Sequence, residues 1–150
     1  MQLAIDRARK GVALNQTPFG ACIVKEDEII SCAHNLVWSG VDITAHAEIQ
    51  AIRQACQRLG GIDLSGCDIY STCEPCPMCF SACHWAKIKK IYYGANIADA
   101  QEAGFNELAI SNELMKDRGD SPVEVVGGCL REECRSLFKE WAQKGHRNVY

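Results

Sequence analysis

The chain has 150 residues, of which 47% are hydrophobic and 23% charged, values typical of one globular domain and not of a disordered or fibrous chain. Its 16 basic and 19 acidic residues give a net charge of −3, which argues against a domain whose main function is to bind nucleic acid phosphates. No apolar stretch approaches the roughly 20 residues that cross a bilayer, and the segment after Met1 lacks the order of a signal peptide. We therefore expect a single cytoplasmic domain over residues 1–150.

Hydrophobic periodicity predicts four main helices and five short strands. In chain order we expect a helix over 3–14, strands over 19–24 and 29–33, a helix over 45–59, a strand over 68–72, a helix over 78–86, strands over 88–93 and 123–126, and a helix over 130–143. Gly94 is expected to end the fourth strand, residues 95–110 to form loop and a short helix, and Leu130 to face the core. A hairpin followed by strands that alternate with helices predicts a mixed sheet covered on both faces.

Ten cysteines are too few for the density that marks a disulfide scaffold. Because no secretory signal precedes them, reduced thiols or metal ligands are the expected states. Cys22, Cys32 and Cys67 lie in apolar, strand-like runs, so we interpret them as small buried side chains.

Two short motifs at helix starts carry the chemistry: His46-Ala47-Glu48, and Cys76-Pro77-Met78-Cys79 about 30 residues later. One imidazole and two thiolates supply three zinc ligands and leave the fourth tetrahedral position open to water. Glu48 lies two residues from His46, where its carboxylate need not be a ligand and can take a proton from the activated water. This combination is typical of zinc nucleobase deaminases.

Two other interpretations of the cysteines stay open at this point. Cys73, Cys76, Cys79 and Cys83 have the spacing of a bacterial iron–sulfur run, although His84 replaces the proline that usually follows. The second interpretation is a structural zinc module, in which Cys73 or Cys83 is the fourth protein ligand and closes the site. We favour the open zinc site and interpret Cys73 and Cys83 as packing residues.

The chain resembles the cytidine deaminase-like superfamily and, within it, the guanine deaminases of bacteria. The segments that carry the resemblance are Pro18-Phe19-Gly20-Ala21, Asn35, Thr44 to Glu48, Glu74 to Cys79, His84-Trp85 and Ala103-Gly104-Phe105. It implies a three-layer α/β/α fold with a five-stranded mixed sheet. It also implies one zinc ion per chain, held by His46, Cys76 and Cys79, with Glu48 as the proton carrier.

The resemblance further implies a set of substrate contacts. Asn35 would hydrogen-bond the purine edge, and Ala47 would line the base pocket. Phe19 and Trp85 would sandwich the ring, a contact that suits any planar base.

The C-terminal tail, about residues 143–150, would by the same resemblance exchange with the partner in a homodimer. Tyr150, the last residue, would then cover the ligand of the other subunit.

The sequence departs from the resemblance at one position. The guanine deaminases carry Asp-Asp after Gly-Phe, with the second Asp a proton carrier near the leaving amine, whereas this chain has Asn106-Glu107. Glu107 keeps the carboxylate but extends it by about 1.5 Å, enough to change the pocket depth or the preferred base.

The implied activity is zinc-dependent hydrolytic deamination of a purine base, from guanine to xanthine and ammonia. Guanosine, another nucleobase or nucleoside, and tRNA adenosine are the alternative substrates. The tRNA enzymes share the zinc motifs but need an electropositive groove. We therefore expect a small-molecule purine as the substrate, with neither nucleic acid nor a membrane as a partner.

Overall fold

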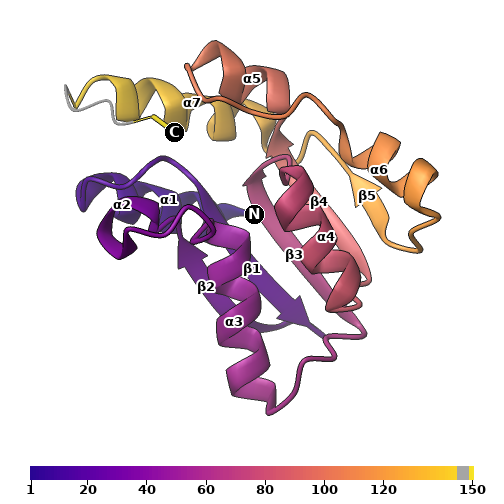
Figure 1. The fold of residues 1–150 in the computed structure, drawn as a ribbon. Coiled ribbons are helices and arrows are strands. Elements are labelled where there is room, and N and C mark those ends of the chain that lie inside the picture. Colours follow the sequence, from indigo (N-terminus) through magenta and orange to yellow (C-terminus); the bar gives the residue numbers. More distant parts are fainter. Residues whose placement is uncertain (145–148) are drawn as a thin grey trace.

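The computed structural model describes residues 1–144 and 149–150 and is built on one five-stranded sheet (Figure 1). Its strand order is β2-β1-β3-β4-β5, in which β1 is antiparallel to β2 and β3, while β3, β4 and β5 are parallel. The strands are β1 (Gly20–Lys25), β2 (Glu28–His34), β3 (Cys67–Cys73), β4 (Lys90–Ala95) and β5 (Glu124–Val126). The predicted mixed sheet of an α/β fold is confirmed.

Helices cover both faces of this sheet. The helices of the described chain are α1 (Gln2–Ala13), α2 (Val37–Gly40), α3 (Ala47–Leu59), α4 (Pro77–Trp85), α5 (Ile97–Glu102), α6 (Asn112–Gly119) and α7 (Arg131–Ala142). Figure 1 shows α3 and α4 side by side on one face, with α1 and α7 on the other. The three-layer arrangement therefore places the starts of α3 and α4 next to each other.

Small and apolar side chains at helical spacing hold these layers together. Ala47, Ala51 and Ala55 on α3 are fully buried, because alanine lets the helix backbone lie close to the sheet. On the other face, α7 buries Cys134, Leu137, Phe138 and Trp141. Gly60, in the left-handed conformation at φ 71°, ends α3 after Leu59, where the predicted helix over 45–59 also ends.

Three local expectations were wrong. β4 does not end at Gly94 but continues to Ala95. The glycine is needed for packing instead, because a side chain at Gly94 would collide with the Cys134 sulfur of α7. Leu130 is 39% exposed, since it is the residue before α7 and has a φ of 51°. Helix α6 was not expected, because its single buried residue, Asn112, leaves no apolar periodicity.

The hairpin of β1 and β2 also corrects an expectation about the cysteines. Cys22 lies directly opposite Cys32 in the antiparallel register, with their Cα atoms 4.1 Å apart, and the two form a disulfide. The eight other cysteines are free. In the part of the chain that the structure describes, we find no helix long and apolar enough to span a membrane.

Candidate active site

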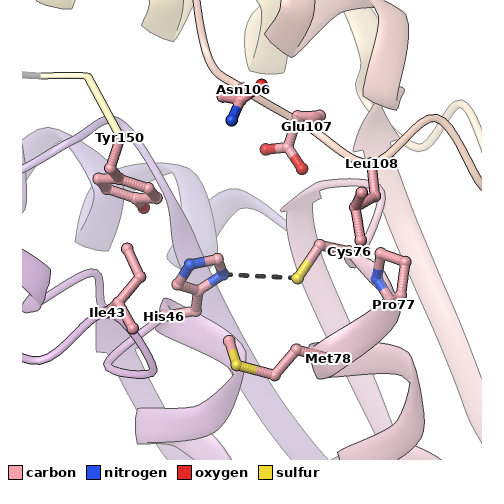
Figure 2. Close-up of a pocket in the computed structure, with 9 residues that line it drawn as sticks. All are labelled: Ile43, His46, Cys76, Pro77, Met78, Asn106, Glu107, Leu108 and Tyr150. Atoms are coloured by element: carbon pink, nitrogen blue, oxygen red, sulfur yellow. Dashed lines mark hydrogen bonds between the residues drawn. The ribbon is translucent and has the colours of Figure 1, made fainter.

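A cavity of about 300 Å³ opens where α3 and α4 begin (Figure 2). Its walls are largely apolar, with charged and polar groups at His46, Cys76, Asn106 and Glu107. The full lining is Ile43, His46, Cys76, Pro77, Met78, Asn106, Glu107, Leu108 and Tyr150. Apolar walls with a few convergent polar groups are typical of small-molecule sites.

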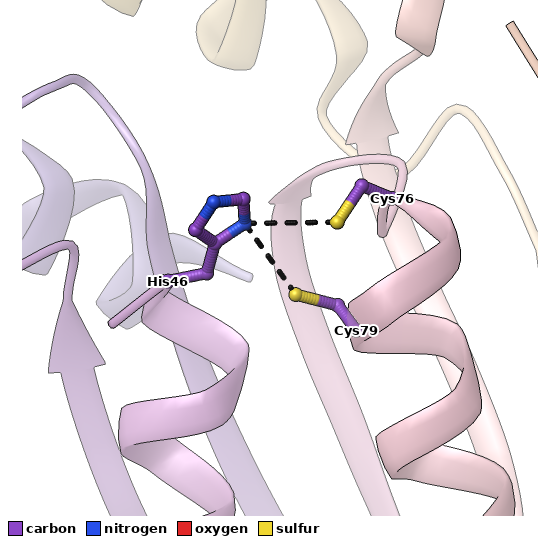
Figure 3. Close-up of side chains that lie close together, drawn as sticks. All are labelled: His46, Cys76 and Cys79. Carbon is purple, nitrogen blue, oxygen red and sulfur yellow. Dashed lines mark hydrogen bonds between the residues drawn. The ribbon is translucent and has the colours of Figure 1, made fainter. Parts of the chain in front are cut away.

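Three potential metal ligands converge at one end of this cavity (Figure 3). His46 and Cys76 precede α3 and α4 as their N-cap residues, and Cys79 lies in the first turn of α4. The His46 Nδ1 atom is 3.6 Å from the Cys76 sulfur and 3.6 Å from the Cys79 sulfur.

These distances fit a zinc ion. Zn–S and Zn–N bonds of about 2.3 and 2.0 Å at a tetrahedral angle put sulfur and nitrogen about 3.5 Å apart, close to both distances. Among the residues that the structure describes, His46, Cys76 and Cys79 form the one group of three or more His, Cys, Asp or Glu residues whose ligand atoms all lie within 4.8 Å of one another. A three-ligand set leaves the fourth position for water or substrate.

The iron–sulfur and closed-zinc interpretations do not fit this geometry. Cys73 and Cys83 are both buried and both lie outside the ligand group. The Cys73 thiol donates to the Asn96 carbonyl oxygen at 3.5 Å, and burial raises the pKa of both thiols, so these residues pack in the core.

The electrostatics of the ligand group favour a cation. The hydrogen bond from Cys79, together with His46, lowers the pKa of Cys76 to about 4, so Cys76 is a thiolate. Burial raises the pKa of Cys79 well above its usual value, and a bound cation would replace that thiol proton. Burial is the largest influence on His46 and lowers its pKa, but the hydrogen bond to Cys76 and the nearby charges of Cys76, Glu48 and Glu107 together outweigh it, so the net pKa is raised.

Glu48 lies in the first turn of α3, beside the ligands and outside their set. Its carboxylate accepts from the Ser71 hydroxyl at 2.8 Å and from the Cys79 thiol at 3.5 Å. The side chain is 5% exposed, and burial raises its pKa. A carboxylate that binds protons more readily than usual is suited to carry them.

Glu107 faces the same space from the segment between α5 and α6 (Figure 2). A small inner cavity, lined by Phe19, Cys73, Glu48 and Glu74, shares His46, Cys76 and Glu107 with the outer one. Burial and the nearby Cys76 thiolate raise the pKa of Glu107 to about 7. Three carboxyl groups, those of Glu48, Glu74 and Glu107, therefore border the inner cavity next to the potential zinc position.

Tyr150 covers this pocket from its own chain. Its hydroxyl accepts from the Asn35 amide nitrogen at 2.6 Å, and its ring centroid is 5.5 Å from that of His46. Its backbone oxygen accepts from the Asn106 N–H at 3.2 Å. Residues 145–148 of the tail lie outside the described residues, so exchange of the tail with a partner stays a prediction.

The other predicted substrate contacts, Asn35, Ala47 and Phe19, are all buried side chains. Asn35 and Ala47 are fully buried, and the Asn35 amide oxygen accepts from the Val37 N–H at 3.0 Å. Phe19 packs edge-on against Phe105 with ring centroids 4.9 Å apart, as a core residue would, yet it also lines the inner cavity.

Trp85 is not at this site, contrary to the expectation that it sandwiches the ring. It ends α4, which is nine residues and thus roughly 13 Å long, whereas Cys76 precedes the start of that helix. Trp85 is 83% exposed and borders a separate cavity with Lys87 and Pro122. Within one chain it is too far from the ligand group to contact a base there.

Sequence reasoning also missed several residues of the site. Ile43, Met78 and Leu108 form the apolar walls, and no periodicity marks them because they lie at helix starts or in loops. Ser71 is buried and needs a hydrogen-bond partner, but the polar residues Asp68 and Thr72 in the same strand left no signal that singled it out.

Comparison with known proteins identifies the class. Residues 1–95 match the model of the cytidine and deoxycytidylate deaminase zinc-binding region, so the chain belongs to this family and is a zinc-dependent hydrolytic deaminase.

Among particular relatives, guanine deaminase of Bacillus subtilis is 41% identical over 133 residues, which cover 89% of this chain and 85% of that protein. A tRNA-specific adenosine deaminase of Aquifex aeolicus is 45% identical over 149 residues, covering 99% of this chain and 95% of that protein. A solved guanine deaminase from Nitrosomonas europaea superposes with a TM-score of 0.86 at 27% identity, covering 95% of this chain and 82% of the other.

Proposed function

We propose that this deaminase acts on a free purine base and converts guanine and water to xanthine and ammonia. The observation that carries the proposal is Tyr150, whose side chain covers a cavity of about 300 Å³ beside the ligand group. A planar base fits between the apolar walls of such a cavity, whereas a nucleotide within RNA has to bring its sugar and phosphates past Tyr150.

The roles of the acidic side chains follow from their positions. When bound, zinc supplies a Lewis acid that lowers the pKa of water. Glu48 takes a proton from the attacking water and delivers it to the ring nitrogen next to C2, while the water oxygen adds to C2. Glu107 then protonates the exocyclic amine, the C–N bond breaks and ammonia leaves, and the Glu107 carboxylate takes up the proton of the C2 hydroxyl as this group becomes a carbonyl. Both carboxyl groups border the same space, so no proton has to travel far.

Asn35 orients the base in this proposal. Its amide nitrogen donates one hydrogen to the Tyr150 hydroxyl in the structure, and the second hydrogen of that amide is the one that would bond a purine edge. In a homodimer, Tyr150 would be supplied by the partner's tail.

Adenosine in tRNA is the second candidate, favoured by the 45% identity to the Aquifex aeolicus enzyme. The charges of the chain support it less. In the basic cluster of Lys87, Lys89 and Lys90, Lys87 pairs with Asp63 at 2.6 Å and Lys90 pairs with Glu124 at 2.7 Å. Lysines neutralised in this way contribute little to phosphate binding.

Ammonia release from a panel of free bases and nucleosides tests the proposal, with the zinc-loaded protein as enzyme and Glu48→Ala as the blank. Guanine should turn over, while cytosine and adenine stay inert. If no member of the panel reacts although zinc is bound, the proposal is wrong and the tRNA alternative takes its place. A gel shift with tRNA at two salt concentrations then measures the steep salt dependence that phosphate contacts produce.

A further inference from the structure

Glu74 is a buried carboxylate with no direct part in the proposed chemistry. It is 8% exposed and lies between the end of β3 and the ligand Cys76. Its Oε1 atom accepts from the Asn112 N–H at 2.8 Å, and its Oε2 atom accepts from the Ile97 N–H at 3.3 Å. Both oxygens are thus used for backbone groups on other elements.

These two backbone groups begin two helices. Ile97 is the first residue of α5 and Asn112 the first of α6, and such N–H groups have no partner within their own helix. The N-cap side chains serve other donors, since Asn96 accepts from Asp99 and Ser111 accepts from Leu114. The partial positive charge at both helix starts also offsets the cost of burying the carboxylate.

Two further hydrogen bonds hold the same point of the chain. The Asn112 side-chain amide donates to the Pro75 carbonyl oxygen at 2.6 Å, and the Glu74 N–H donates to the Ala95 carbonyl oxygen at 2.8 Å. Residues 74 and 75 are therefore bonded to β4, α5 and α6 at once.

The segment between α5 and α6, residues 103–111, carries Glu107 and forms neither helix nor strand. Since it lacks a regular hydrogen-bond ladder, its position depends strongly on the helices at its two ends. Glu74 binds the first residue of both helices and lies two residues from Cys76. We propose that Glu74 is a positioning residue, which sets the place of Glu107 relative to the zinc ligands. This inference rests on the proposed role of Glu107.

Hydrogen exchange of the zinc-loaded protein tests the inference without any substrate. Glu74→Gln keeps the shape of the side chain, but its amide nitrogen replaces one acceptor oxygen, so one of the two backbone N–H groups loses its hydrogen bond. We expect amides in 103–112 to exchange about tenfold faster, with zinc content and the exchange of β4 unchanged. The matched control is Glu113→Gln, which removes an exposed charge from the first turn of α6 without touching either donor. Equal exchange in the two variants would overturn the inference.

A double-mutant cycle tests the same inference through the reaction rate. Glu74→Gln should lower kcat about 100-fold by misplacing Glu107, and adding Glu74→Gln to Glu107→Gln should cost less than threefold more. Full additivity of the two losses would contradict a role through Glu107. If guanine is not a substrate but exchange in 103–112 rises as expected, the proposed function fails while the positioning role stands. Glu74→Asp, which keeps the charge but is too short to span both amides, replaces Glu74→Gln if that variant does not fold.

Discussion

The substitution Glu48→Gln should remove proton transfer while leaving zinc binding and stability unchanged. The glutamine oxygen can still accept from the Ser71 hydroxyl, which Glu48 bonds at 2.8 Å, and Glu48 does not belong to the ligand group. Zinc content should therefore stay at one ion per chain. Because burial raises the pKa of Glu48, a neutral side chain there removes a desolvation cost, and the melting temperature should not fall.

The expected loss of rate follows from the two proton transfers that the proposed reaction assigns to Glu48. One positioned acid or base contributes about 10²- to 10⁴-fold, and Glu48 both accepts and donates, so we expect kcat to fall by about 10⁴, or about 5.5 kcal/mol. Ammonia release under saturating base and zinc analysis of the same sample measure both quantities. A Glu48→Gln enzyme that keeps its zinc and works within tenfold of the parent rate would refute the reasoning.

Three further experiments, two substitutions and a thiol titration, test separate parts of the structure. Cys76→Ala should lose zinc and activity together, as should chelation of the parent protein, and full metal occupancy in that variant would refute the ligand assignment. Trp85→Ala should leave kcat/KM within about twofold, because the side chain is 83% exposed at the far end of α4; a larger loss in a monomeric sample would contradict the placement. Thiol titration of the unfolded, unreduced and metal-free protein should count eight thiols, since Cys22 and Cys32 form a disulfide, whereas ten would show that the pair is reduced.

The ligand group was predictable because its signals are local. His46 and Glu48 are two residues apart, Cys76 and Cys79 three, and each pair lies at the start of a helix that its own apolar spacing reveals. The alternation of strands and helices then makes both helix starts meet at one edge of the sheet. Local patterns were thus sufficient to locate the group of potential metal ligands and the carboxylate of Glu48 beside it.

Other features depend on contacts that no local pattern records. Glu74 bonds backbone N–H groups 23 and 38 residues away, and main-chain groups leave no mark on the sequence. The disulfide depends on the strand register that sets Cys22 opposite Cys32. The place of Trp85 within its own chain was not predictable for another reason, because a role carried over by resemblance says nothing about which end of α4 faces the pocket.

The central claim is that the pocket takes a free base. Its most direct test measures kcat/KM of one zinc-loaded preparation for guanine and for an anticodon stem–loop RNA that carries adenosine. The account predicts xanthine formation with a kcat/KM at least about 100-fold above that for inosine formation in the RNA. Inosine formed efficiently while guanine stays unchanged would contradict it.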